Sequence, residues 1–235
     1  RASPVTSTAQ EALKERAERY VLGVAPAATR FVTVQVDVQG KYFVLHVDAV
    51  GPDLERWTIA RRVITAPPQD APSADTRALD PGRYREDWAG LFDLLDEVFP
   101  VAGTGYGIKP CALIVDSGGA DGVTANAYAF YRQARKLGHL RRVFISKGLP
   151  GWKSERAREV EPAKINQTRR KVPTDIRIVQ MGTWRLKSEV IESLLRRDPG
   201  PDAYHLSAHL PEEVFEELCA ERRTKTGWEL RQGQK

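Results

Sequence analysis

The chain has 235 residues, of which 41% are hydrophobic and 29% charged, so it can bury a core under a well-solvated surface. No apolar run approaches the roughly 20 residues that a membrane helix needs, so we expect no membrane partner. The net charge of +5 is compatible with a nucleic-acid partner but does not demonstrate one. Because the first residue is not Met, we expect a piece of a longer protein.

The first part of the chain predicts a short helix followed by three antiparallel strands. Residues 8–20 have a helical pattern. Residues 31–38 alternate strictly between valine and other side chains, which is typical of a strand with one buried face. A turn at Gln39-Gly40 leads into a second strand at 41–47, and residues 55–64 predict a third.

The rest of the chain predicts alternating helices and strands. Residues 111–115 form a continuously apolar run, as in a central strand that is buried on both faces. The other predicted elements are helices at 84–99, 123–137, about 184–197 and about 212–223, and strands at 142–146 and 176–180. This order predicts an α/β fold with a mixed sheet, three antiparallel strands and then parallel strands, flanked by helices, as in the ribonuclease H-like fold.

Two aspartates end strands that this fold places side by side. Asp37 lies at the end of the first strand, and Asp116 ends the apolar strand before Ser-Gly-Gly. Two carboxylates held close together repel each other unless a cation lies between them. Oxygen ligands without a nearby His or Cys favour Mg²⁺ or Mn²⁺, and two such ions catalyse phosphodiester hydrolysis. For each aspartate alone, the other interpretation is that it shapes a turn.

Six segments in order resemble the nuclease domain of the lambda-type family of phage terminase large subunits. They are VDVQGKYFVLHVDAVG, ERWTI, DWAGLFDLL, ALIVDSGG, VFISKG and MGTWRLKSEVIESLL. The resemblance covers about residues 15–230. It implies a ribonuclease H-like endonuclease domain that cuts both strands of concatemeric viral DNA. The cutting is expected to use two divalent metal ions, which hydrolyse the phosphodiester bond as described above.

The resemblance also assigns residues. The first metal-ligand aspartate of the family falls on Asp37, the acid of its Asp-Ser-Gly-Gly motif on Asp116, and the lysine of its Lys-Gly motif on Lys147. These three are the candidate catalytic residues. Lys147 follows the strand at 142–146, where it can hold a scissile phosphate or point into water.

A third metal-ligand acid is expected near the end of the chain. The predicted last helix carries Glu213, Glu216, Glu217 and Glu221, and three of these share a face at i, i+4 and i+8. Glu221 lies in LCAERR, which resembles a Leu-x-x-Glu segment of the family, so it is the candidate within this chain. A solvated acidic helix face is the alternative. The family also has a later acidic stretch beyond the position of Lys235, and we favour that stretch for the third acid.

DNA contacts are expected in a basic loop at 150–173. The candidates are Lys153, Arg156, Arg169, Arg170 and Lys171. We expect a single nuclease domain over 1–235, with 1–28 as a helical extension from an ATPase domain that is not in this chain. No Walker motif occurs, so we expect no nucleotide site.

The resemblance implies double-stranded DNA, the ATPase domain in cis, a small terminase subunit and a portal as partners, in the host cell cytoplasm. Two other functions fit the same fold. One is a non-catalytic ribonuclease H-like module that binds DNA or packaging partners. The other is a nuclease of the resolvase or transposase type.

Overall fold

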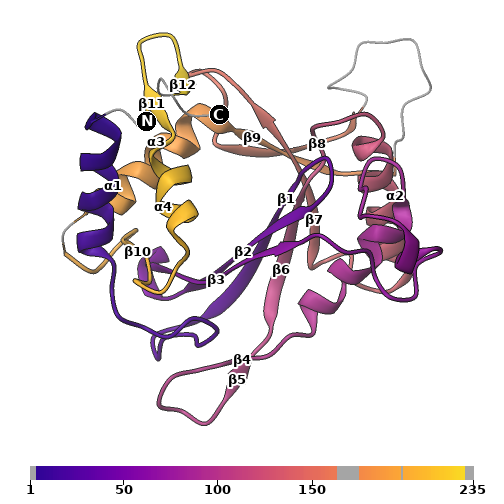
Figure 1. Cartoon of the computed structure of the whole chain (residues 1–235), viewed down its shortest axis with the longest axis horizontal. Helices are drawn as coiled ribbons and strands as arrows, with labels where there is room; N and C mark the ends of the chain where they lie inside the picture. Colours follow the sequence, from indigo (N-terminus) through magenta and orange to yellow (C-terminus); the bar gives the residue numbers. More distant parts are fainter. Residues whose placement is uncertain (1–3, 163–174, 197, 231–235) are drawn as a thin grey trace.

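The fold is built on one mixed sheet with helices on both faces (Figure 1). The computed structural model describes residues 4–162, 175–196 and 198–230. The eight strands of the sheet lie in the order β10-β3-β2-β1-β6-β7-β9-β8. Their bounds are β1 Phe31–Val38, β2 Phe43–Val50, β3 Arg56–Ile64, β6 Pro110–Asp116, β7 Val143–Leu149, β8 Ala157–Val160, β9 Ile178–Gly182 and β10 Tyr204–His205.

Strand direction changes in the middle of the sheet. Strands β1, β2 and β3 pair antiparallel through short connections, whereas β1, β6, β7 and β9 pair in parallel. The edge strand β8 is antiparallel to β9, and β10 at the other edge is parallel to β3. This arrangement confirms the predicted mixed sheet and is consistent with the ribonuclease H-like fold.

One face of the sheet carries the main apolar core. Alternate side chains of a strand point to the same face, and the four valines of β1 are buried on this one. Helix α2 (Val123–Lys136) and a segment of 3₁₀ turns cover it. Phe43 packs edge-on against Trp88, with ring centroids 5.5 Å apart, and Phe92 stacks on Phe130 of α2 at 4.4 Å. These rings fill the space between sheet and helix.

The opposite face is covered by the other three helices. Figure 1 shows α1 (Pro4–Arg16), α3 (Thr183–Leu195) and α4 (Glu212–Cys219) together on the side of the sheet away from α2. They enclose a second, smaller apolar cluster formed by Leu13, Leu194, Leu206, Leu210, Val214, Phe215 and Cys219. None of the helices in the described ranges is both long and apolar enough to cross a membrane.

Smaller elements complete the described chain. Two hairpins pair β4 (Phe99–Pro100) with β5 (Gly107–Ile108), and β11 (Glu221–Arg223) with β12 (Trp228–Leu230). The 3₁₀ turns are η1 Pro52–Leu54, η2 Ala74–Thr76, η3 Arg85–Leu91 and η4 Asp93–Leu95.

The structure corrects three predicted elements. Residues 84–99 are 3₁₀ turns and a short strand instead of one α-helix, with hydrogen bonds such as Phe92 N to the carbonyl of Ala89. The last helix ends at Cys219, so Glu221 begins a strand. The predicted basic loop contains the strand β8. In the first case Trp88, Leu91, Phe92 and Leu95 are buried although the segment is not an α-helix, whereas Val98 is exposed.

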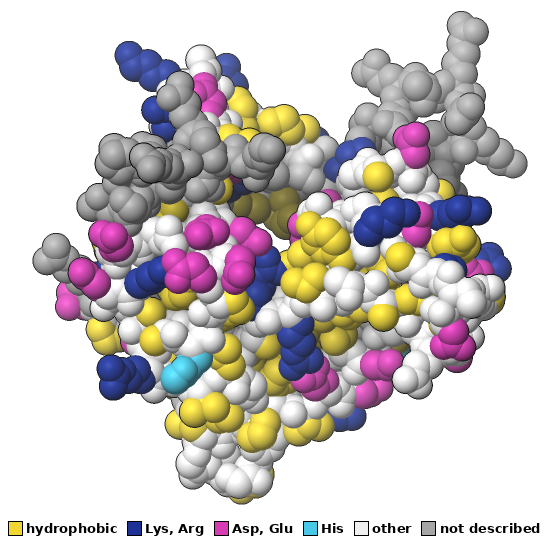
Figure 2. Space-filling model, in the orientation of Figure 1, with side chains coloured by type: hydrophobic (Ala, Val, Ile, Leu, Met, Phe, Trp, Pro, Cys, Tyr) yellow, Lys and Arg dark blue, Asp and Glu magenta, His cyan; other side chains and the backbone are white. Residues whose placement is uncertain are grey.

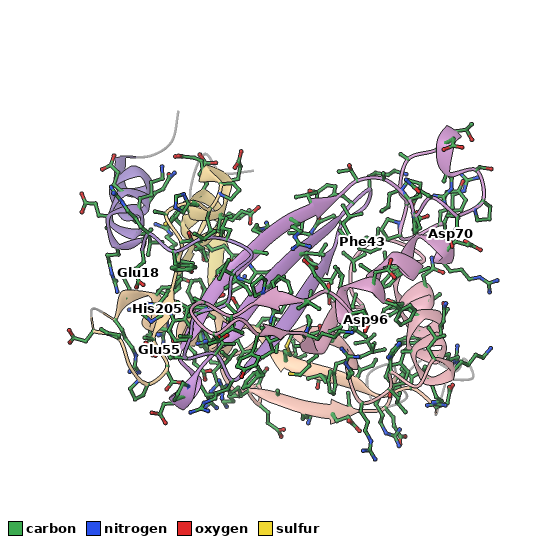
Figure 3. All side chains as sticks on the ribbon, turned by 90° about the horizontal axis from the view of Figure 1, so that it is seen from below. Glu18, Phe43, Glu55, Asp70, Asp96 and His205 are labelled. Atoms are coloured by element: carbon green, nitrogen blue, oxygen red, sulfur yellow. The ribbon has the colours of Figure 1, made fainter. Side chains whose placement is uncertain are left out.

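The segment after α1 is held against the sheet by His205 of β10. The Nδ1 atom of His205 lies 2.5 Å from a carboxylate oxygen of Glu18, and Nε2 lies 2.9 Å from one of Glu55. Figure 3 shows Glu18 and Glu55 on the two sides of His205. The imidazole also stacks on Trp57, with ring centroids 5.0 Å apart. This ring therefore joins three segments that are distant in the sequence.

Replacing His205 is expected to destabilise the fold. His205→Ala leaves two carboxylates without their shared partner, and we expect it to lower the free energy of unfolding by about 1–3 kcal/mol. His209→Ala, at an exposed position four residues away, is the matched control and should change it by less than about 0.5 kcal/mol. Urea denaturation measures both, and equal effects of the two substitutions would contradict the assignment.

Candidate active site

Asp37 and Asp116 lie side by side at the carboxyl edge of the sheet. Strands β1 and β6 are parallel neighbours, and Val36 pairs with Val115. The next residue of each strand is an aspartate, so the two carboxylates leave the same face of adjacent strands. Neighbouring strands are about 4.8 Å apart. The structure therefore brings together two acids that are far apart in the sequence, as the strand order predicted.

The turn after β6 holds the Asp116 carboxylate. The backbone N–H of Gly118 donates a hydrogen bond of 3.2 Å to Asp116 Oδ1. Ser117 is fully buried, and its Oγ and backbone N–H both donate to the carbonyl of Ser146 in β7. A Cβ atom on Gly118 would lie 3.4 Å from Asp116 Oδ2. The Asp-Ser-Gly-Gly sequence thus shapes a turn and orients a carboxylate at once, so the two interpretations of Asp116 are compatible.

The electrostatic environment of Asp116 disfavours its negative charge. Burial raises the pKa of the Asp116 carboxyl group above its usual value, and the negative charge of Asp37 raises it as well. Hydrogen bonds from the backbone of Gly118 and Ser117, and the positive charge of Lys147, act in the opposite direction. Asp37 is exposed and accepts a hydrogen bond from Gln39 Nε2. A cation between the two carboxylates would relieve both the burial cost and the repulsion.

Lys147 lies close to Asp116, but it is one residue beyond Ser146, the residue of β7 that pairs with Asp116. It is inside β7 instead of following it. Because side chains alternate along a strand, Ser146 shares the face of the aspartates and Lys147 leaves the other face. Lys147 nevertheless lies near enough for its charge to lower the pKa of Asp116.

A cleft of about 560 Å³ opens between Asp37 and α4. Its sheet side is lined by Asp37, Gln39, Tyr42, Val44, Arg61 and Val63, and its helix side by Pro211, Glu213, Val214 and Glu217. Arg61 donates a hydrogen bond to Glu217 across the cleft at 2.5 Å. Glu213 faces the same space, and no ion pair connects it to another residue of the described chain. The cleft therefore joins one predicted metal ligand to two of the predicted candidates for the third acid.

Glu221, the third acid assigned within the chain, lies elsewhere. It begins β11 and forms an ion pair with Lys187 of α3, and it lines a pocket with residues of α1 and α3. The predicted helical face of Glu213, Glu217 and Glu221 is interrupted because α4 ends at Cys219 and the chain turns into a hairpin. In the described ranges, no three His, Cys, Asp or Glu side chains are close enough to hold a metal ion together.

A row of polar side chains next to the aspartates was not predicted. Gln35, His46 and Arg61 pair across β1, β2 and β3, one row behind Asp37 on the same face. The Oε1 atom of Gln35 and the Nη1 atom of Arg61 are buried and have no hydrogen-bond partner among the described residues. The polar residues that alternate with valines in β1 were the available sequence signal.

The predicted DNA contacts are only partly within the described chain. Lys153 and Arg156 are exposed in the segment that follows β7, and Arg156 forms an ion pair of 2.8 Å with Glu189 of α3. Arg169, Arg170 and Lys171 lie outside the described residues.

Comparison with known proteins gives one family. The model of the family described as terminase large subunit gpA, endonuclease domain, matches residues 3–235. No curated protein and no solved structure matches the chain. The family match confirms the resemblance that the six sequence segments carry.

We expect Asp116→Asn to stabilise the metal-free protein at neutral pH. The pKa of Asp116 is higher in the folded than in the unfolded chain, so folded-state stability falls as the pH rises from about 3.9 through the raised pKa. Asparagine does not titrate and can still accept the hydrogen bond from Gly118. In a chelator, the melting temperature of the variant should exceed that of the wild type at neutral pH, and the difference should shrink toward pH 4 or so.

The control is Asp75→Asn, at an exposed position on the 3₁₀ turn η2. It should leave the melting temperature nearly unchanged across the same pH range. A lower melting temperature for Asp116→Asn at neutral pH would contradict the account of Asp116.

Proposed function

Because the chain belongs to the family of terminase large subunit gpA endonuclease domains, we propose that it cuts double-stranded concatemeric DNA with divalent metal during viral DNA packaging. The observation that carries this proposal is the parallel register of β1 and β6, which places Asp37 beside Asp116. The alternative of a non-catalytic module with the same fold gives no reason for two adjacent carboxylates, one of them half-buried.

The residues at this edge fit a hard divalent cation such as Mg²⁺ or Mn²⁺. All their donor atoms are oxygens, and the negative charge of Asp37, which helps to raise the pKa of Asp116, would be offset by a cation between the two carboxylates. Asp37 and Asp116 would hold the metal, Gln39 would orient Asp37, and the Gly118 N–H would orient Asp116. A bound cation supplies an acidified water and offsets the charge that develops on the phosphate.

A two-ion site needs a further acid, and α4 offers Glu213 for this role. Glu217 is engaged by Arg61, and Glu221 by Lys187, whereas Glu213 faces the cleft that Asp37 lines. Glu213 therefore replaces Glu221 as the candidate within the chain. An acid beyond Lys235 is the competing candidate. If Glu213 is the ligand, α4 has to move toward the sheet, because no three acids of the described chain lie close enough together to hold a metal ion.

We further propose the partners and setting that such a domain requires. The ATPase half of the same protein, a small subunit and a portal would align it on DNA, which raises the local concentration of the cutting site. Lys147 leaves the opposite face of the sheet, but its charge acts on Asp116, so it would bind the scissile phosphate by reaching past the carboxyl edge once DNA is in place. The setting is the cytoplasm of the host cell.

The first test is nicking of a supercoiled plasmid in Mn²⁺. Asp37→Asn and Asp116→Asn should each reduce the rate by more than the roughly 10–100-fold that loss of an outer-shell partner costs, because a ligand itself is lost. Asp75→Asn should nick at the wild-type rate, and a chelator should stop all nicking. Full activity of Asp37→Asn would refute the site. DNA binding without any cleavage by the wild type would favour the non-catalytic module, and a preference for branched junctions would favour a resolvase.

The second test identifies the third acid. Glu213→Gln should reduce Mn²⁺-dependent nicking by about 10-fold or more if it is a ligand, whereas Glu216→Gln, its matched control on the same helix, should not. Glu221→Gln should also have little effect. The same variants are compared in a chain extended past Lys235. If the extension raises activity strongly and makes Glu213 dispensable, the third acid lies downstream and the assignment to Glu213 is wrong.

A further inference from the structure

Two tryptophans anchor the hairpin of β11 and β12 to the body of the protein. The indole Nε1 of Trp228 donates a hydrogen bond of 3.0 Å to the carbonyl of Trp184. A Cβ atom on Gly227 would lie 2.5 Å from the Trp184 ring, so only glycine lets the hairpin approach so closely. Trp152, in the segment that follows β7, packs against Trp184 with ring centroids 5.3 Å apart. The position of the hairpin is therefore defined by the packing of the buried Gly227 and of Trp228 against Trp184.

This anchor lies at the same edge of the sheet as the two aspartates. Trp152 follows the end of β7 by three residues, and Trp184 is the second residue of α3, which begins directly after β9. Both strands are parallel to β1 and β6, so their carboxyl ends share the edge that carries Asp37 and Asp116. Figure 1 shows the hairpin projecting at this edge, and Figure 2 shows Lys and Arg side chains gathered where it projects.

The hairpin presents cations whose charge is not neutralised. Its two carboxylates form ion pairs, Glu221 with Lys187 and Glu229 with Arg222. Lys225 is exposed at the tip, in the turn closed by the Thr224 N–H and the Gly227 carbonyl. No carboxylate of the described chain forms an ion pair with Arg223 or Lys225. Local excess charge of this kind attracts phosphates.

The contacts of Trp152 favour a phosphate contact over base stacking. The guanidinium of Arg223 lies over the Trp152 ring, 4.6 Å from its centroid, and Trp184 packs against the same indole. A base would have to displace one of them to stack. Trp152, Arg223, Thr224 and Lys225 instead line an open cleft of about 610 Å³. Trp152 thus acts as a positioning residue for Arg223.

We infer that the β11–β12 hairpin is a contact for the sugar–phosphate backbone of duplex DNA, made by Arg223 and Lys225 beside the candidate active site. The choice of DNA as the partner rests on the proposed function, whereas the position, charge and anchoring of the hairpin do not. Rigid anchoring lets the hairpin hold a duplex at a fixed place relative to Asp37 and Asp116. The contact is independent of base sequence, since phosphates carry no sequence information.

The test measures binding of a fluorescent duplex by anisotropy in a chelator, so that cleavage plays no part. Arg223→Ala combined with Lys225→Ala removes two phosphate contacts. We expect binding to weaken by about 10-fold or more at roughly 0.1 M salt, and the slope of log K against log salt to become shallower by about 1.8. The loss should be similar for duplexes of different sequence. Lys225→Glu, a single change at the exposed tip, should weaken binding without affecting the fold.

The matched control is Lys136→Ala combined with Arg141→Ala, which removes the same charge at the opposite edge of the sheet. Its affinity and salt slope should stay close to those of the wild type. Equal losses in the two double variants would show a general charge effect and overturn the inference. Unchanged duplex affinity in the hairpin variants, or a loss confined to single strands, would overturn it as well. Plasmid nicking by the wild type in Mn²⁺ tests the proposed function separately, whatever the binding result.

Discussion

The pairing of β1 with β6 is the constraint on which the candidate site depends. Side chains alternate along a strand, so a slip of one residue would move an aspartate to the opposite face. The register is enforced by the valines of β1, each of which contributes roughly 1.5–3 kcal/mol through burial. Repulsion between Asp37 and Asp116 costs about 3.5 kcal/mol at a strand spacing of about 4.8 Å and an effective dielectric constant near 20, less than the four valines together contribute. Core packing therefore outweighs the repulsion and holds the two acids together.

The two faces of the sheet differ in polarity: one is apolar and forms the core, and the other carries polar side chains. Towards α2 the sheet is apolar and closely packed, and this face supplies the stability. Towards α4 the first three strands carry polar groups such as Gln35, His46 and Arg61, two of which have buried atoms without hydrogen-bond partners in the described chain. Unsatisfied groups of this kind cost stability and are typical of places where a ligand or water completes the bonding.

The carboxyl edge of the sheet carries both acidic and basic side chains, and the two kinds come from different secondary-structure elements. The acids come from the ends of β1 and β6 and from α4 across the cleft. The cations come from Lys147 in β7 and from the hairpin that Trp184 anchors. Acids and cations that stood in contact would neutralise one another. Because they are carried by different elements, the acids proposed to hold a metal ion and the cations proposed to bind phosphate can lie at one edge of the sheet without neutralising one another.

The sequence by itself determined the six longest-paired strands of the sheet, β1, β2, β3, β6, β7 and β9, its mixed character and the adjacency of Asp37 and Asp116. Period-two burial is a local property, and chain order then limits which strands can be neighbours. The position of Glu221 and the anchored hairpin were decided only by the tertiary structure. Three-residue strands have no periodicity to detect, and the end of α4 at Cys219 is not marked by a helix-stop residue. Gly227 is buried against Trp184, 43 residues earlier, and no local pattern could have revealed that contact.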